Sequence, residues 1–440
     1  MRARVCTFGF IFLCFIFATI CAAPAPQQPN DGPSLGELRG VAEADLNYDG
    51  SRVIVRLRNG EIGFWDVAEG KRAPGDLAPD ATAECYRISE DRRFVLIGFE
   101  DGAVVFDANT AMAVSPPLKA KVRCELHTSA VFAPDGATVV IFEPKEASVW
   151  KVASGEKVAA VPYPEGPHED APPFASFTSD GAACFVMSPD GIVTRHETQT
   201  WSAVGKPMRH PRLDTAYEFG FNARADGKWI ATFDDAGENG PKGYLQIWDG
   251  LTGKPVGAPL LNTNGFTARF LAEPDRILIL PARGNAAMRA LPSLKLLYPV
   301  PAHDEVEGPS AEMSPDGKWL ITWGSDRTIR VLDSTTGKLK DHQPEKATIR
   351  NVLVGPDPAA LFIVYDNSTF MTAHFHDNYV FRLRLPDLNT LGAFRSFANV
   401  ARTSLSRDGS RLMVQEGGDH DQRLLIFRAA DLMPVPSTPP

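Results

Sequence analysis

The stretch from Met313 to Leu339, MSPDGKWLITWGSDRTIRVLDSTTGKL, contains the pattern from which the fold can be predicted. SPDG and GSDR have the composition of tight turns, because Gly adopts a positive φ at low cost and Asp bonds to its own backbone. WLITW is a short apolar run, and TIRVLD is an alternating run rich in β-branched residues. With the third turn, TTGK, the stretch predicts two adjacent antiparallel strands bounded by turns.

The same pattern recurs nine times along the chain. The aspartates of the first turn are Asp49, Asp91, Asp135, Asp180, Asp226, Asp275, Asp316, Asp357 and Asp408. Successive positions in this series differ by 41 to 51 residues, which fits the unit of about 40 to 50 residues that forms one four-stranded propeller blade. The runs after the first turn, such as FVLIGF (Phe94 to Phe99), are continuously apolar, as expected of strands covered on both faces. The following runs are more amphipathic.

The order of turns and strands resembles the WD-repeat β-propeller family, in its divergent bacterial-type form, over roughly residues 35 to 435. The dipeptide that names the family stands at Trp65-Asp66 and Trp248-Asp249, with Phe106-Asp107 and Leu332-Asp333 as variants. The Gly-His pair of the family is missing. The resemblance also implies a structural hydrogen bond between a His and an Asp within a blade, for which the matching pairs are His168 with Asp190 and His303 with Asp326.

We therefore predict an all-β protein, a single β-propeller of eight or nine four-stranded blades over residues 35–440. Nine units exceed the usual range of about 4 to 8 blades. The sixth unit, around Asp275, matches the repeat pattern least well. It is the unit that an eight-bladed ring would lack. Two smaller rings are the alternative, but no linker separates the units.

The N-terminal segment has the features of a secretory signal. Residues 1–23 combine Arg2 and Arg4, an apolar core and a small-residue end, so we expect a signal peptide. Residues 24–34, PAPQQPNDGPS, form a Pro-rich linker. We predict an exported protein, periplasmic or extracellular, with no membrane insertion beyond the signal segment. A retained anchor and a lipoprotein built on Cys21 remain alternatives.

Charge and cysteine content limit the partners and the covalent chemistry. The formal net charge of −9, without a dense Lys/Arg stretch, argues against nucleic-acid binding. Beyond the signal segment the chain contains Cys85, Cys124 and Cys184. Each lies in or beside an apolar run, so we expect three unpaired core thiols, with one disulfide as the alternative.

Three loops between the two strands of a unit are long and polar, and we predict that they form the ligand-binding face. They contain all of the candidate ligand-binding residues: Asp234, Asp235, Glu238, His374, His376, Asp377, Asp419 and His420. His374 and His376 with neighbouring carboxylates have metal-ligating chemistry, and the acidic group at Asp234 could gather oxygens for calcium. We interpret both groups as solvated polar loops rather than metal sites, so we assign no metal, cofactor or catalytic residue.

The predicted function is a non-catalytic, exported binding or scaffold module that recognises a protein or another ligand through loops on one face. The alternative is a propeller enzyme, a hydrolase or a cofactor-dependent dehydrogenase, with acidic or His residues converging in the central channel. A purely structural envelope protein is the third possibility. The sequence indicates neither the ligand nor the oligomeric state.

Overall fold

The computed structural model describes residue 38 and residues 40–435, with gaps. The gaps are residues 74–82, 123, 125–128, 164–172, 212–217, 236–242, 263–265, 272–274, 282–284, 302, 304–309, 325, 345–347, 367–377, 393, 398 and 418–422. All described residues belong to the unit Gly32–Pro440. Within this described part the regular elements are strands, and no helix there has the length and hydropathy needed to cross a bilayer. The signal peptide and linker lie outside it and stay predictions.

The strands form nine antiparallel sheets, which we number as blades 1 to 9 in chain order. Blade 1 contains β1 (Val41–Leu46), β2 (Arg52–Leu57) and β3 (Ile62–Asp66), and blade 2 contains β4 (Ala83–Ile88), β5 (Phe94–Phe99) and β6 (Gly102–Asp107). Blade 3 contains β7 (Ala130–Phe132), β8 (Thr138–Phe142), β9 (Glu146–Lys151) and β10 (Glu156–Pro162). Blade 4 contains β11 (Phe174–Phe177), β12 (Ala183–Met187), β13 (Ile192–Glu197) and β14 (Ala203–Arg209). Blade 5 contains β15 (Glu218–Ala223), β16 (Trp229–Asp235), β17 (Gly243–Asp249) and β18 (Pro255–Asn262). Blade 6 contains β19 (Phe266–Phe270), β20 (Arg276–Pro281), β21 (Ala287–Ala290) and β22 (Leu296–Pro299). Blade 7 contains β23 (Ser310–Met313), β24 (Trp319–Trp323), β25 (Thr328–Asp333) and β26 (Leu339–Pro344). Blades 8 and 9 contain β27 (Thr348–Val354), β28 (Ala360–Asp366), β29 (Asn378–Arg384), β30 (Arg395–Phe397); and β31 (Val400–Leu405), β32 (Arg411–Glu416), β33 (Arg423–Arg428).

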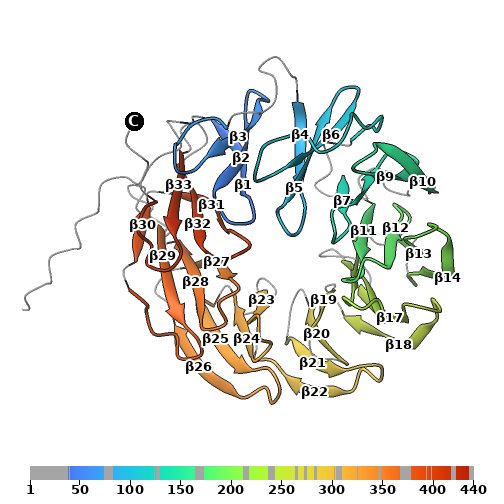
Figure 1. The fold of residues 1–440 in the computed structure, drawn as a ribbon. Coiled ribbons are helices and arrows are strands. Elements are labelled where there is room, and N and C mark those ends of the chain that lie inside the picture. The colour runs from blue at the N-terminus through green and yellow to red at the C-terminus, as the bar shows by residue number, and fades with distance from the viewer. Residues whose placement is uncertain are drawn as a thin grey trace, which may run out of the picture. The chain divides into compact units, whose positions relative to one another are not determined.

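The nine blades stand in a ring and form a β-propeller (Figure 1). Six blades have four strands, and in blades 1, 2 and 9 the fourth strand is reduced to isolated bridges such as Trp65 with Arg72. The prediction of a single propeller of eight or nine blades is confirmed, with nine. The weak sixth unit is a complete blade of four strands.

The first strand of each blade lies nearest the axis of the ring. First strands of neighbouring blades contact one another, as β23, β27 and β31 do, and in Figure 1 they stand around the axis of the ring. The continuously apolar runs of the sequence are therefore the second strands, and the amphipathic runs are the third. The strand nearest the axis precedes each Asp turn.

The Asp turn joins the first strand of a blade to the second. In blade 7 Asp316 accepts hydrogen bonds from the hydroxyl of Ser314 (2.7 Å) and the backbone N–H of Lys318 (3.2 Å). These bonds, the Ser314 bond first, lower the pKa of Asp316 to about 2. Because the folded pKa lies below the unfolded value of about 4, the stability from this turn is present above pH 4 and is lost as the pH falls toward 2.

Replacing a turn glycine can destabilise the protein in two ways, through backbone strain and through a clash of the added Cβ. Gly253 and Gly317 allow the two effects to be compared. Both have a positive φ, +67° and +72°, so a side chain at either position is strained by about 1 kcal/mol. A Cβ on Gly253 would lie 1.8 Å from the backbone oxygen of Lys206 in blade 4, whereas a Cβ on Gly317 meets nothing within 4 Å. We expect Gly253→Ala to lower the free energy of unfolding by at least about 3 kcal/mol, and Gly317→Ala by about 1 kcal/mol. Guanidinium unfolding of both variants tests this, and equal losses would show that the contact is unimportant.

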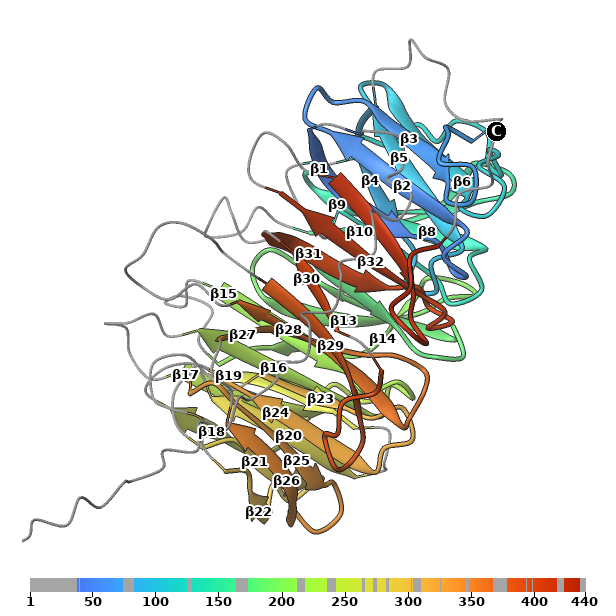
Figure 2. The same cartoon turned by 90° about the vertical axis from the view of Figure 1, so that its left-hand side faces the viewer.

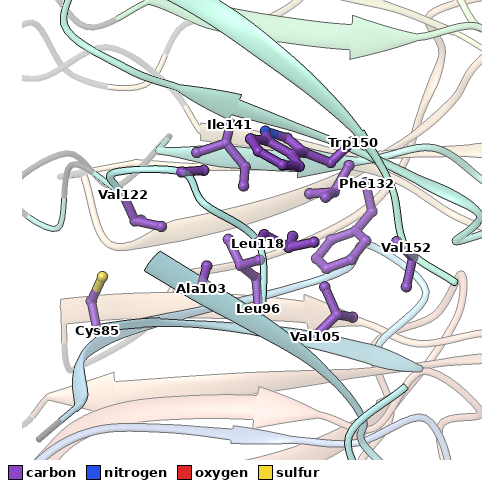
Figure 3. Close-up of a cluster of buried hydrophobic side chains, with 12 residues drawn as sticks. Cys85, Leu96, Ala103, Val105, Leu118, Val122, Phe132, Ile141, Trp150 and Val152 are labelled. Atoms are coloured by element: carbon purple, nitrogen blue, oxygen red, sulfur yellow. The ribbon is translucent and has the colours of Figure 1, made fainter. Parts of the chain in front are cut away.

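The hydrophobic core is divided into nine clusters, and each joins two consecutive blades. Figure 3 shows the cluster between blades 2 and 3, where Leu96 and Val105 of one blade face Phe132 and Ile141 of the next. One blade alone would expose its two apolar faces, so it is stabilised by its neighbours. This is the physical reason for the ring.

The ring closes where blade 9 meets blade 1 (Figures 1 and 2). Val53 of β2 and Met413 and Ile426 of blade 9 belong to the same buried cluster. The backbone N–H of Asp408 also donates to the oxygen of Tyr48 (3.1 Å), and Ser410 donates to Asp49 (3.1 Å). Within the described residues, no sheet mixes strands from the two ends of the chain.

A disulfide joins Cys85 of β4 to Cys124, which lies in the connection between blades 2 and 3. The prediction of three unpaired thiols is therefore wrong for this pair. The repeat brings the connection back across the first strand of its own blade, so two cysteines 39 positions apart become neighbours. Cys184 is a buried free thiol, as predicted.

Candidate functional site

A cavity of about 730 Å³ opens at the ends of the first strands of blades 7, 8 and 9. We call it the channel cavity. Its lining is formed by Arg92, Glu312, Met313, Pro315, Asn351, Val352, Leu353, Val354, Gly355, Pro356, Arg402, Thr403, Ser404, Leu405, Ser406 and Arg407. These residues belong to the strand ends and to the Asp turns that follow them, except Arg92, which comes from the equivalent turn of blade 2.

Arg92 reaches the cavity across blade 1. Its Nη1 donates to the backbone oxygen of Leu46 at the end of β1 (3.1 Å). Burial lowers the pKa of Arg92, the nearby carboxylate of Asp45 opposes this, and the positive charges of Arg402 and Arg407 lower it further. The guanidinium groups of Arg402 and Arg407 are therefore close enough to repel that of Arg92.

The acidic groups near the cavity balance only part of this charge. Asp45 lies 3.4 Å from Arg402 and also accepts a hydrogen bond from the Tyr86 hydroxyl (2.8 Å). Burial, followed by the charge of Asp45, raises the pKa of Tyr86, so the tyrosine stays a neutral donor. Glu312 pairs with Arg269 (2.5 Å) outside the lining. With three arginines and one glutamate, the lining has a formal charge of +2 (3 − 1) in a chain whose net charge is −9.

Neutral groups complete the lining. The Oγ of Ser404, which is buried, has no hydrogen-bond partner among the described residues. Thr403 accepts a long hydrogen bond from Asn351 (3.5 Å). Buried polar groups are normally hydrogen-bonded, so an unsatisfied hydroxyl in a cavity wall indicates a place where a ligand or water can bind.

Of the residues predicted for the binding loops, Asp234 is described in full. The structure places it inside blade 5, completely buried at the end of β16, where its Oδ1 accepts a hydrogen bond from the backbone N–H of Tyr244. His210 Nε2 lies 3.5 Å from its Oδ2. The Asp234 carboxylate thus faces the interior of the blade rather than a loop surface.

The other predicted residues cannot be placed in the same way. Asp235 is the last residue of β16, and its side chain lies outside the described part of the structure. The remaining six lie outside it entirely: Glu238, His374, His376, Asp377, Asp419 and His420. In sequence they stand between second and third strands, whereas the Asp turns, which contribute to the channel cavity, join first to second strands. Within the described residues no group of three or more His, Cys, Asp or Glu is arranged to hold a metal.

The His–Asp pairs implied by the family resemblance are partly confirmed. In blade 7 the ring of His303 contacts Asp326 through Nδ1 (2.8 Å) and Thr322 through Nε2 (2.9 Å). His168 lies outside the described residues. A third pair, His210 with Asp234, was missed because His210 follows β14 at a position where no family motif marks it.

Trp248 extends the His210–Asp234 pair of blade 5 into a chain of contacts. Its indole donates to Thr232 (2.9 Å), which lies 2.9 Å from His210 Nδ1. These side chains are buried together, so their contacts link the strands of blade 5.

Arg92 was also missed, although the sequence contains a signal for it. In six turns the Asp is followed by a Gly with positive φ: Gly50, Gly136, Gly181, Gly227, Gly317 and Gly409. Arg92 stands at this position in blade 2 with φ +60°. A non-glycine residue held in such a conformation is strained, and strain of this kind is concentrated at functional sites.

We expect Arg92→Gly to leave the fold intact. The change relieves about 1 kcal/mol of backbone strain and removes the hydrogen bond to Leu46, which contributes about 1 kcal/mol. The free energy of unfolding should stay within about 1 kcal/mol of the parent value, as measured by guanidinium unfolding. A loss of more than about 3 kcal/mol would mean that Arg92 is needed for folding rather than for the cavity.

The fold defines the protein as a nine-bladed β-propeller, with a cavity at the ends of the first strands of blades 7, 8 and 9. The sequence matches no protein-family model and no curated protein sequence. Among solved structures, one titled as a eukaryotic initiation factor is similar over 87% of this chain and 94% of that chain, with 13% identity and a TM-score of 0.63. The C-terminal WD40 domain of Sif2 aligns over 76% of this chain and 95% of that chain, with 14% identity and a TM-score of 0.49. Dihydro-heme d1 dehydrogenase NirN aligns over 73% of this chain and 76% of that chain, with 15% identity and a TM-score of 0.46. The first of these likenesses supports the propeller fold.

Proposed function

We propose that the protein is an exported, non-catalytic binding module whose channel cavity holds a protein partner. The observation that carries the proposal is the channel cavity itself. Its volume of about 730 Å³ is in the range of ligand sites, and its lining mixes apolar residues with a few charged and polar groups. The disulfide between Cys85 and Cys124 supports export, because such bonds persist in oxidising compartments.

Two surfaces compete for the partner: the channel cavity and the long loops between second and third strands. Asn351→Trp should fill the cavity, because Asn351 is a half-buried lining residue of β27. Leu339→Trp is the control, since Leu339 is 45% exposed and is not among the lining residues. A third variant replaces residues 367–377 by a short Gly-Ser linker.

The test is affinity capture from an envelope extract with these variants and the parent protein. We expect the parent, the Leu339→Trp variant and the loop variant to capture the same partner, and the Asn351→Trp variant to lose it. Loss with the loop variant alone would favour the loop face instead. Capture by all variants, or by none including the parent, would refute the proposal. The alternative of a propeller enzyme stays a prediction.

A further inference from the structure

We propose that the channel cavity binds an acidic, extended polypeptide segment, whose carboxylates contact Arg92, Arg402 and Arg407. The inference deepens the proposed function and rests on it. It specifies the chemical class of the partner, which the propeller fold alone does not indicate.

Charge complementarity is the first argument. The lining has a formal charge of +2 within an acidic chain, and Glu312, its one carboxylate, is already paired with Arg269. Asp45 lies outside the lining and forms a long pair with Arg402 (3.4 Å), so it offsets one of the three positive charges. Arg407 is paired only weakly in this structure, 3.9 Å from Glu90, whose side chain is 94% exposed. Guanidinium groups bind carboxylates through paired, charge-assisted hydrogen bonds.

The backbone of the cavity wall is the second argument, and it favours a peptide over a small anion. β23, β27 and β31 each stand at the end of their sheet, hydrogen-bonded to a neighbouring strand on one side only. An edge of this kind presents backbone N–H and C=O groups that can pair with an extended chain. A phosphate ion can accept hydrogen bonds from guanidinium and backbone N–H groups, but it cannot pair along a strand edge with alternating N–H and C=O groups as an extended peptide does.

The mixture of side chains is the third argument. Met313, Pro315, Leu353 and Leu405 supply apolar surface between the arginines, and Ser404 supplies an unsatisfied hydroxyl. A lone anion leaves this apolar surface exposed, whereas a peptide covers it with its own side chains. The wall also spans three consecutive blades, which suits an extended ligand.

The experiment measures the binding of capped hexaglutamate peptide to the full-length protein by isothermal titration calorimetry. We expect Arg407→Gln to weaken binding about tenfold, and Arg92→Gly combined with Arg407→Gln to weaken it further. Arg428→Gln is the matched control, because Arg428 has a similar exposure of 50% but pairs with Asp431 on the outer part of blade 9. Binding by the parent should also weaken when the salt concentration is raised to about 0.15 M.

Three outcomes would overturn the inference: no binding of hexaglutamate by the parent, equal weakening in the Arg428→Gln control, or tighter binding of inorganic pyrophosphate than of hexaglutamate. The last would assign the arginines to a phosphate ligand. Failure of this inference is distinguishable from failure of the proposed function, because partner capture that is sensitive to Asn351→Trp would persist without hexaglutamate binding.

Discussion

Replacing Ile426 by Asp should prevent the ring from closing and should lower the free energy of unfolding by at least about 4 kcal/mol. Ile426 is 1% exposed and belongs to the cluster that joins blade 9 to blade 1. A carboxylate there would be buried without a partner among apolar residues such as Val53 and Met413. Because the described strands of blades 9 and 1 form separate sheets, packing across the cluster is the main force that closes the ring.

The matched control is Leu339→Asp, which introduces the same group at a position that is 45% exposed. Thermal unfolding and size-exclusion chromatography of both variants test the prediction. An open ring exposes two apolar blade faces, so we expect Ile426→Asp to associate or aggregate while Leu339→Asp remains like the parent. A monodisperse Ile426→Asp protein with unchanged stability would show that closure does not depend on this cluster.

Loss of the disulfide between Cys85 and Cys124 should cost about 4 kcal/mol of unfolding free energy in the chain-entropy model. The bond closes a loop of 39 positions and ties the connection between blades 2 and 3 to β4. Reduction restores freedom to the unfolded chain, so the folded state becomes relatively less stable. Equilibrium unfolding of the parent with and without reductant measures the effect.

The double variant Cys85→Ala/Cys124→Ala serves as the control. It should be as stable as the reduced parent, and reductant should not change it further. Thiol labelling must confirm that the parent is reduced. If the fully reduced parent then unfolds at the same denaturant concentration as the oxidised protein, the bond has no stabilising role.

The fold could be predicted because each unit repeats local chemistry that fixes its own turns. An Asp that accepts backbone N–H groups, followed by Gly at positive φ, specifies the turn without help from distant residues, as Asp316 and Gly317 do. The sixth unit matched the repeat pattern least well for a physical reason. There Asp275 itself has the positive φ of +66° that Gly supplies elsewhere, so the turn is made from different residues.

The channel cavity could not be predicted in the same way. Arg92 and Arg402 come from blades 2 and 9, and the closing of the ring makes them neighbours. Sequence spacing contains no information about that closure. The replacement of Gly by Arg92 was visible, but its meaning depended on knowing that the turn faces the channel. The pairing of Cys85 with Cys124 likewise depended on how the chain returns across blade 2.

The absence of a shared sheet at the junction of blades 9 and 1, within the described residues, has a consequence for the evolution of the protein. In this arrangement every blade is built from one continuous segment of the chain. Duplication or deletion of such a stretch would add or remove a complete blade, and neither end of the coding region would need a compensating change. An unusually large number of blades is therefore accessible through single genetic events.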